Sequence, residues 1–166
     1  MQKKNAEVIG IISDTHDNMP AIEKAVMFFN ENDVDIVLHA GDIISPFTAL
    51  AFKNLKSPFI GIFGNNDGDK VHLREFFSFS KIGEIHDDPY ISKIGGKNIA
   101  ITHKPEIVDS FALKYDIVIY GHTHEKDLRR NKALVLNPGE CCGYLTGKKS
   151  VALLYPAKMD AKIADL

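Results

Sequence analysis

The chain has 166 residues, of which 45% are hydrophobic and 25% are charged, a composition typical of globular domains. Its 20 basic and 22 acidic side chains nearly cancel, so the overall charge favours neither nucleic acid nor an anionic membrane as a partner. The apolar stretches are far shorter than the roughly 20 residues of a membrane span, so we expect no membrane-spanning helix.

The length fits one domain over residues 1–166. The first residues, MQKKNAE, are polar and lead straight into a strand pattern without the apolar core of a signal peptide. Two adjacent cysteines, Cys141 and Cys142, cannot easily form a disulfide with each other. We therefore expect a cytoplasmic protein in which both thiols are reduced and serve as small packing residues.

The first half of the chain alternates strand patterns with helical patterns. The apolar run at residues 8–12 predicts a strand, and Pro20 fits the first turn of a helix after it. That helix would bury the apolar residues at helical spacing, Ile22, Ala25, Val26 and Phe29. A strand over 36–41, a helix over 47–53 and a strand over 58–64 follow. This alternation predicts a parallel sheet.

From residue 82 the pattern changes to strands joined by short turns. Residues 87–103 predict a hairpin whose turn contains Gly95 and Gly96. A short helix is expected over 106–114, followed by a strand over 116–121. Further strands are expected near Leu128, at 134–136, at 151–155 and at 162–163. The sum is an α/β domain in which helices flank stacked mixed sheets.

Metal-competent side chains follow five of the predicted strands. They are Asp14, His16, Asp42, Asn65, His103, His122 and His124. Because ligands of open α/β sheets bind beyond the carboxyl ends of the strands, these seven side chains should converge. One such residue alone is more often a turn or surface residue, but chance does not readily place all seven in this way. The pattern therefore predicts a metal site, with Gly41, Gly64 and Gly121 allowing sharp turns beside it.

The number of ligands predicts two divalent ions, because seven exceed what one four-coordinate zinc ion takes. Asp42, on the central strand, can bridge two ions that lie ~3.5–4 Å apart. One ion would be held by Asp14, His16 and His124, and the other by Asn65, His103 and His122. Mixed nitrogen and oxygen ligands favour manganese first, with nickel, zinc, iron or cobalt as alternatives.

Five segments in this order, SDTHDN, LHAGD, FGNND, ITH and YGHTH, resemble the motifs of the calcineurin-like metallophosphoesterase superfamily. The segment NPGECCGYLTG resembles the small bacterial and archaeal phosphodiesterase branch of that superfamily. The resemblance covers about residues 8–155. It implies a four-layer α/β/β/α sandwich with mixed sheets, and it gives metal-binding roles to the same seven residues.

The expected reaction is hydrolysis of a phosphodiester by a hydroxide that bridges the two ions, with Asp42, Asn65 and His103 as catalytic residues. Two divalent ions and two carboxylates leave two positive charges, which a hydroxide and a diester anion would balance. This charge balance favours diesters over dianionic monoesters. Many relatives carry histidine where this chain has Asn66, which cannot protonate a leaving group, so replacing Asn66 should cost little activity.

Two other roles stay open: a phosphomonoesterase, and a non-catalytic scaffold for protein interactions with the same fold. The expected partner is a small phosphodiester, with no membrane and no specific nucleic-acid binding, and an oligomer stays open. Lys104 could contact phosphate but, as is usual for lysine, is expected to face solvent. His39 is either a supporting hydrogen-bond partner of the site or an ordinary strand residue.

Overall fold

A six-stranded sheet combines four strands from the amino-terminal half of the chain with the last two strands, in a computed structural model that describes residues 6–166. Residues 1–5, on which part of the expectation for the segment MQKKNAE rests, lie outside the described residues. In spatial order, the strands are β11 (Asp160–Asp165), β10 (Ser150–Tyr155), β1 (Ile9–Ile12), β2 (Ile36–His39), β3 (Phe59–Ile62) and β4 (Gly83–His86). The strands β1 to β4 pair in parallel, so the predicted parallel sheet is confirmed, and β10 joins β1 in the antiparallel direction.

The second sheet contains five strands from the carboxyl-terminal half. In spatial order they are β5 (Tyr90–Ile94), β6 (Lys97–Thr102), β7 (Ile117–Tyr120), β9 (Leu134–Pro138) and β8 (Lys126–Arg130). The central strands β6, β7 and β9 are parallel, while β5 and β8 pair antiparallel at the two edges. The predicted hairpin is confirmed: Ile94 pairs with Lys97 across Gly95 and Gly96, which both have positive φ, as a tight primed turn requires.

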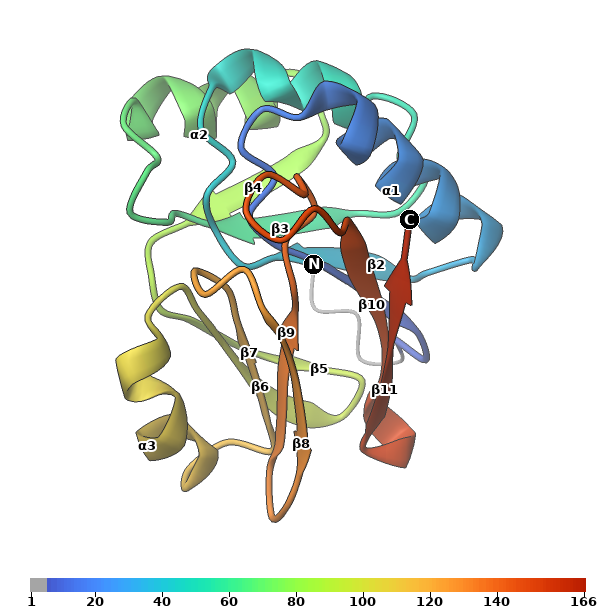
Figure 1. The fold of residues 1–166 in the computed structure, drawn as a ribbon, viewed down its shortest axis with the longest axis vertical. Coiled ribbons are helices and arrows are strands. Elements are labelled where there is room, and N and C mark those ends of the chain that lie inside the picture. The colour runs from blue at the N-terminus through green and yellow to red at the C-terminus, as the bar shows by residue number, and fades with distance from the viewer. Residues whose placement is uncertain (1–5) are drawn as a thin grey trace.

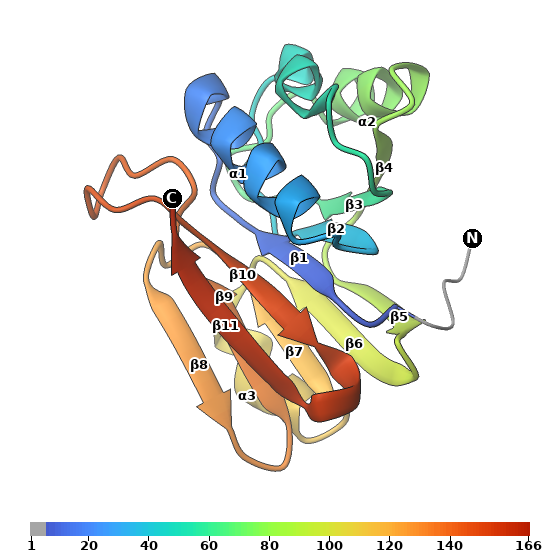
Figure 2. The ribbon, with the colours of Figure 1, turned by 90° about the vertical axis from the view of Figure 1, so that its right-hand side faces the viewer.

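The two sheets pack face to face, and helices cover their outer faces (Figures 1 and 2). Between the sheets lies a core rich in isoleucine and leucine, in which Ile11 and Leu38 of the first sheet meet Ile101 and Ile119 of the second. A second core lies between the first sheet and its helices, and a third, smaller one lies under α3 (Val108–Ala112) on the second sheet. This is the expected four-layer α/β/β/α sandwich with mixed sheets.

The helix α1 (Met19–Glu31) confirms the first helical prediction. Asn18 caps its first turn by accepting a hydrogen bond from the Ala21 amide, and Pro20 lies where its missing N–H costs nothing. Its buried face contains the four apolar residues expected there. Two other helices differ from expectation. The segment at 47–53 is a 3₁₀ helix, η1 (Pro46–Phe52), and the helix at 106–114 reduces to η2 (Pro105–Ile107) followed by the short α3.

The pattern failed to predict α2 (Lys70–Phe79) and the strand β4 after it. The helix α2 buries only Leu73 and Phe77, while Val71 and Phe79 on its other faces are largely exposed, so its apolar residues do not form one stripe. Of the helices in residues 6–166, none has both the length and the apolar character needed to cross a membrane.

Candidate metal centre

The seven predicted ligands lie on loops that leave five neighbouring strand ends. The loops follow β1 (Asp14 and His16), β2 (Asp42), β3 (Asn65), β6 (His103) and β7 (His122 and His124). Because the strands in each sheet run parallel here, all these loops emerge at one edge of the sandwich. The structure therefore brings together residues more than 100 positions apart, as the direct contact between His122 and Asp14 shows.

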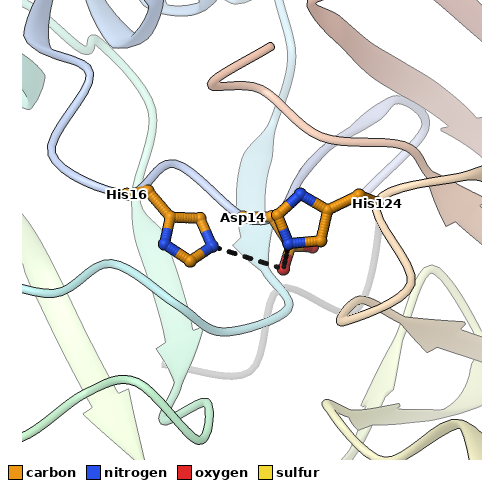
Figure 3. Close-up of side chains that lie close together, drawn as sticks. All are labelled: Asp14, His16 and His124. Atoms are coloured by element: carbon orange, nitrogen blue, oxygen red, sulfur yellow. Dashed lines mark ion pairs between the residues drawn. The ribbon is translucent and has the colours of Figure 1, made fainter. Parts of the chain in front are cut away.

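Asp14, His16 and His124 form a first group of ligand atoms (Figure 3). The Asp14 Oδ1 atom lies 3.5 Å from Nε2 of His124 and 3.9 Å from Nε2 of His16. The other Asp14 oxygen accepts hydrogen bonds from the Ser13 hydroxyl at 2.6 Å and from the His122 amide at 3.1 Å. The Oδ2 atom is thus held by Ser13 and His122, while Oδ1, to which the His122 amide also donates at 3.3 Å, faces the two imidazoles.

Asn65, His103 and His122 form a second group. The carboxamide oxygen of Asn65 lies 3.0 Å from Nε2 of His103 and 2.8 Å from Nδ1 of His122. The other ring nitrogen of His103 is 2.7 Å from the Ala40 carbonyl, to which it must donate, so Nε2 is the nitrogen left for a metal. His103 is buried, whereas Asn65 and His122 are exposed.

Asp42 lies between the two groups. Its Oδ2 atom is 3.4 Å from Nε2 of His16 and 3.3 Å from Nε2 of His103, one histidine from each group. Asn66 donates two hydrogen bonds to the same carboxylate, from its backbone amide at 2.9 Å and from its side-chain amide at 2.8 Å. This arrangement gives Asn66 a contact that the sequence did not predict.

Five of the seven positions have a left-handed backbone. They are Asp14, His16, Asp42, His122 and His124, with φ between 41° and 74°. Such a conformation costs roughly 1–2 kcal/mol in a non-glycine residue, and it gathers at functional sites where the surrounding structure enforces it. Here the loops are tied to each other: the amide of Asp14 donates to Gly41, and the amides of Thr15 and His16 donate to Asp42.

Two of the three glycines at the site are needed because neighbouring side chains pack directly against them, and not for the sharp turns that were expected. At Gly64, a Cβ atom would lie 2.2 Å from the Asp42 carboxylate, and at Gly121 it would lie 2.1 Å from the Ser13 hydroxyl. Neither residue has a positive φ, whereas Gly41 does, at 100°. Any side chain at Gly64 or Gly121 would therefore displace the carboxylates from the site.

The two buried carboxyls of the site titrate in opposite directions. Burial raises the pKa of Asp14 above its ordinary value, despite the hydrogen bond from Ser13 and the nearby histidines. Burial acts the same way on Asp42, but His103 and the two hydrogen bonds from Asn66 outweigh it and lower the Asp42 pKa. Burial alone would lower the pKa of His103, but its contact with Asp42 raises it. Asp14 is therefore a buried acid that its hydrogen bonds satisfy only in part, in a site that contains four imidazoles. A bound cation would stabilise its charged form.

The donor set fits divalent metal ions. Two atoms bound to one tetrahedral ion at about 2.1 Å lie about 3.4 Å apart, close to the 3.3–3.5 Å that separate Nε2 atoms of His16, His103 and His124 from carboxylate oxygens. The Nε2 atom of His16 is buried and has no hydrogen-bond partner among the described residues. A metal ion would give this nitrogen the partner it lacks.

Asp67 supports the site in a way that the sequence did not predict. Its buried carboxylate accepts hydrogen bonds from four backbone amides, those of Asp42, Ile43, Ile44 and Gly64, at 2.6–3.1 Å. It thereby joins the loops after β2 and β3. The signal was available in the segment GNNDGD, because aspartate in a glycine-rich turn commonly accepts nearby amides.

His39 is a supporting residue, which settles one of the open alternatives. Its Nδ1 atom accepts a hydrogen bond from the Gly41 amide at 3.1 Å, so its Nε2 donates to the Thr15 hydroxyl at 3.0 Å. Burial, with the nearby charge of His103, lowers the pKa of His39 to about 3, so the ring is neutral. It connects the two loops that carry Asp14 and Asp42.

Glu140, also missed, is a fully buried acid that contacts His124 at 2.7 Å. Burial disfavours its charge, but hydrogen bonds from His124 and Thr146 outweigh this and lower its pKa to about 2. It is the only charged residue between Ala133 and Lys148, which was the available signal. Cys141 and Cys142 are free and buried as expected, and burial raises the pKa of Cys142 to about 12. With Glu140 counted, the charge balance of the site no longer selects a diester by itself.

A cavity of about 410 Å³ opens beside the second group, with Asn65, His103 and His122 in its wall. Lys104 also lines this cavity, and its ammonium lies 3.7 Å from the Asp88 carboxylate. The Lys104 side chain is 53% exposed, so it does reach solvent as expected, but it does so beside the predicted ligands. An anion bound at the second group would lie near this positive charge.

Comparisons with known proteins agree with this geometry. Residues 8–159 match the sequence model of the calcineurin-like phosphoesterase superfamily domain. The chain is 43% identical over 157 residues to phosphodiesterase MJ0936 of Methanocaldococcus jannaschii, which covers 92% of this chain and 95% of that protein. It is 34% identical over 141 residues to a probable metallophosphoesterase of Methanothermobacter thermautotrophicus, covering 80% and 76% of the two chains.

Solved structures show the same architecture. The structure of an archaeal phosphodiesterase superposes with a TM-score of 0.88 at 41% identity, over 96% of this chain and 99% of that one. Vacuolar protein sorting 29 from Cryptosporidium parvum shares the fold, with a TM-score of 0.67 at 17% identity over 98% and 97% of the two chains. Taken with the match over residues 8–159, these results place this chain in the calcineurin-like phosphoesterase superfamily.

Proposed function

We propose that the chain is a metal-dependent phosphodiesterase that holds two divalent ions and acts as one domain over residues 1–166. The observation that carries this proposal is the convergence of seven predicted ligands from five loops into two groups that share Asp42. The similarity to phosphodiesterase MJ0936 and to the solved structure of an archaeal phosphodiesterase supports the choice of substrate class. Bound ions would acidify a water molecule and polarise the phosphoryl oxygens.

Different residues of the chain would bind the two ions and carry out catalysis. Asp14, His16 and His124 would hold one ion, and Asn65, His103 and His122 the other, with Asp42 shared between them. Asp42, Asn65 and His103 would act as the catalytic residues, because Asp42 contacts both groups through His16 and His103, while Asn65 and His103 border the cavity. The contact with His103 and, after it, the hydrogen bonds from Asn66 lower the pKa of Asp42, which favours the carboxylate form that binds a cation.

Substrate binding would use the cavity beside the second group. There, Lys104 attracts the anionic phosphodiester, while Asn65 and His122 are exposed to it. Asn66 cannot donate a proton to a leaving group. We therefore expect esters with good leaving groups to react faster than alkyl esters.

The test is hydrolysis of bis(4-nitrophenyl) phosphate by protein freed of metal with a chelator and then reloaded. We expect no turnover without metal, and turnover after addition of manganese, with nickel, zinc, iron and cobalt as alternatives to be compared. The monoester 4-nitrophenyl phosphate is the matched control. Faster hydrolysis of the monoester would replace this proposal with a phosphomonoesterase, and the absence of hydrolysis with two ions bound would favour a scaffold.

The remaining parts of the proposal concern the setting of the protein. We place it in the cytoplasm, because its two adjacent cysteines are free and buried. The near balance of basic and acidic residues supports a small phosphodiester over specific nucleic-acid binding. Size measurement of the purified protein by light scattering decides between a monomer and an oligomer.

A further inference from the structure

Glu140 gathers hydrogen bonds from one metal-binding histidine and from a surface loop. The residue lies between β9 and β10 and is 0% exposed. Its carboxylate accepts from Nδ1 of His124 at 2.7 Å, from the Thr146 hydroxyl at 2.7 Å and from the Leu145 amide at 3.0 Å. The Thr146 amide and the Cys142 thiol donate to it as well, at 2.5 Å and 3.1 Å. A carboxylate that is buried so completely and satisfied so fully has a fixed orientation.

The fold of the loop explains how these donors reach Glu140. Gly143 and Gly147 have positive φ, 70° and 72°, and turn the chain back on itself at both ends of the loop. The amides of Leu145 and Thr146 then point inward, although the Leu145 side chain is 75% exposed. The loop projects beside the carboxyl terminus in Figure 2, in orange-red.

The contact with Glu140 determines which nitrogen of His124 is available. Every other group around the carboxylate is a donor, so the carboxylate acts as an acceptor and Nδ1 of His124 must carry the proton. The lone pair then lies on Nε2, which points at Asp14 from 3.5 Å. This is the same arrangement that the Ala40 carbonyl imposes on His103 in the second group.

We propose that Glu140 is a positioning residue, which fixes the tautomer and direction of the His124 ring and so strengthens metal binding by Asp14, His16 and His124. The inference rests on the proposed metal-dependent function and deepens it. It gives the segment NPGECCGYLTG a role at the metal centre, through a residue that itself need not contact the ion.

The same residues offer an alternative, because His124, Glu140 and Cys142 could form a metal site of their own. The geometry argues against it. Both oxygens of Glu140 already accept hydrogen bonds, and the buried Cys142 sulfur donates to one of them as a thiol. An ion here would have to displace several of these donors.

The test is titration of metal-free protein with manganese, followed by calorimetry, in Glu140→Gln and in two control variants. Glu125→Gln makes the same change of charge next to His124, on an exposed side chain. Thr146→Val removes one hydroxyl donor to Glu140 but leaves the contact with His124 in place. We expect Glu140→Gln to weaken one of the two ions about 10- to 100-fold and the other by less than about 3-fold, with both controls close to the wild type.

The tautomer of His124 supplies a second readout without metal or activity. Long-range ¹H–¹⁵N spectra of the metal-free protein should show the His124 proton on Nδ1, and Glu140→Gln should give a mixture of tautomers. Spectra of His124→Ala assign the signal. Urea unfolding of each metal-free variant establishes that it is folded.

Three results would overturn the inference. In the first, Glu140→Gln binds both ions as tightly as the wild type. In the second, Thr146→Val weakens metal binding as much as Glu140→Gln does, which would make the effect one of loop structure. In the third, Glu140→Gln loses a whole ion, which would make Glu140 a ligand. All three are results of binding measurements. They are therefore distinct from a failure of the proposed hydrolysis, which would leave the positioning of His124 intact.

Discussion

The two halves of the metal centre differ in what surrounds them. Asp14, His16 and His124 are enclosed, with side-chain exposures of 0%, 20% and 12%, and His124 is held from behind by Glu140. In the second half, only His103 is buried, whereas Asn65 and His122 are exposed and border a cavity. For the proposed two-ion site, we therefore expect the enclosed half to retain its ion and the open half to meet the substrate.

The largest effect is expected at Asp42, because its Oδ2 atom lies within 3.5 Å of an imidazole nitrogen from each half, that of His16 and that of His103. Asp42→Asn should lower kcat by more than about 100-fold. Loss of a hydrogen bond that only supports a metal ligand costs up to about 100-fold, and loss of a shared ligand should cost more. Titration with manganese should show both ions weakened. Asp109→Asn, at an exposed carboxylate on α3, is the control. If Asp42→Asn weakened the binding of only one ion, Asp42 would belong to one half of the site and would not be shared between the two.

A pair of histidine variants tests whether the two halves differ in how firmly they retain an ion. His124→Ala removes a ligand from the enclosed half, whose three side chains are at most 20% exposed, whereas His122→Ala opens a half that already meets solvent. We expect excess manganese to restore activity to His122→Ala to within about 10-fold of the wild type, but not to His124→Ala. The measurement is the rate of diester hydrolysis as a function of manganese concentration. Equal rescue of both variants would show that the halves do not differ in retention.

Asn66 should have a larger effect than the sequence predicts. From sequence, Asn66→Ala is expected to cost little, because asparagine cannot serve as the acid. In the structure, its side-chain amide donates to Asp42, and this contact lowers the Asp42 pKa. We now expect a loss of about 10-fold in manganese affinity, with a smaller loss in kcat at saturating metal. Asn66→Asp is the informative companion, since it keeps the size of the side chain but repels Asp42. Unchanged affinity in both variants would return Asn66 to the role the sequence assigned it.

Most of the fold could be predicted because its strands are short apolar runs that end in polar residues. Strands such as β1 and β7 are buried along their whole length, so period and composition identified them. The helix α2 escaped because it buries only Leu73 and Phe77, while Val71 and Phe79 add exposed apolar residues outside that spacing. The type of helix at 47–53 also could not be predicted, since nothing in its spacing separates a 3₁₀ helix from an α-helix.

The ligands could be predicted from the sequence, whereas Asp67 and Glu140, which support them, were not predicted. Asp14 and His122 each follow a strand, and the parallel topology brings strand ends together whatever the loops do. Asp67 and Glu140 also lie beyond strand ends, those of β3 and β9, but their importance comes from loops that fold back onto them. Such loop conformations depend on tertiary contacts that leave no periodic signal in the sequence.

Lys104 should give the smallest effect and the most direct probe of the open half. It lines the cavity next to His103 but is half exposed and paired with Asp88, so solvent screens its charge. Lys104→Ala should therefore raise KM for a diester about 2- to 5-fold, which corresponds to the up to about 1 kcal/mol of an exposed charge pair, and leave kcat nearly unchanged. High salt should shrink the difference, because it screens exposed charges. Lys132→Ala, on an exposed turn between β8 and β9, makes the same change of charge away from the cavity. A fall in kcat without a change in KM would instead make Lys104 part of the chemistry, and the open half would then supply the proton donor that Asn66 cannot be.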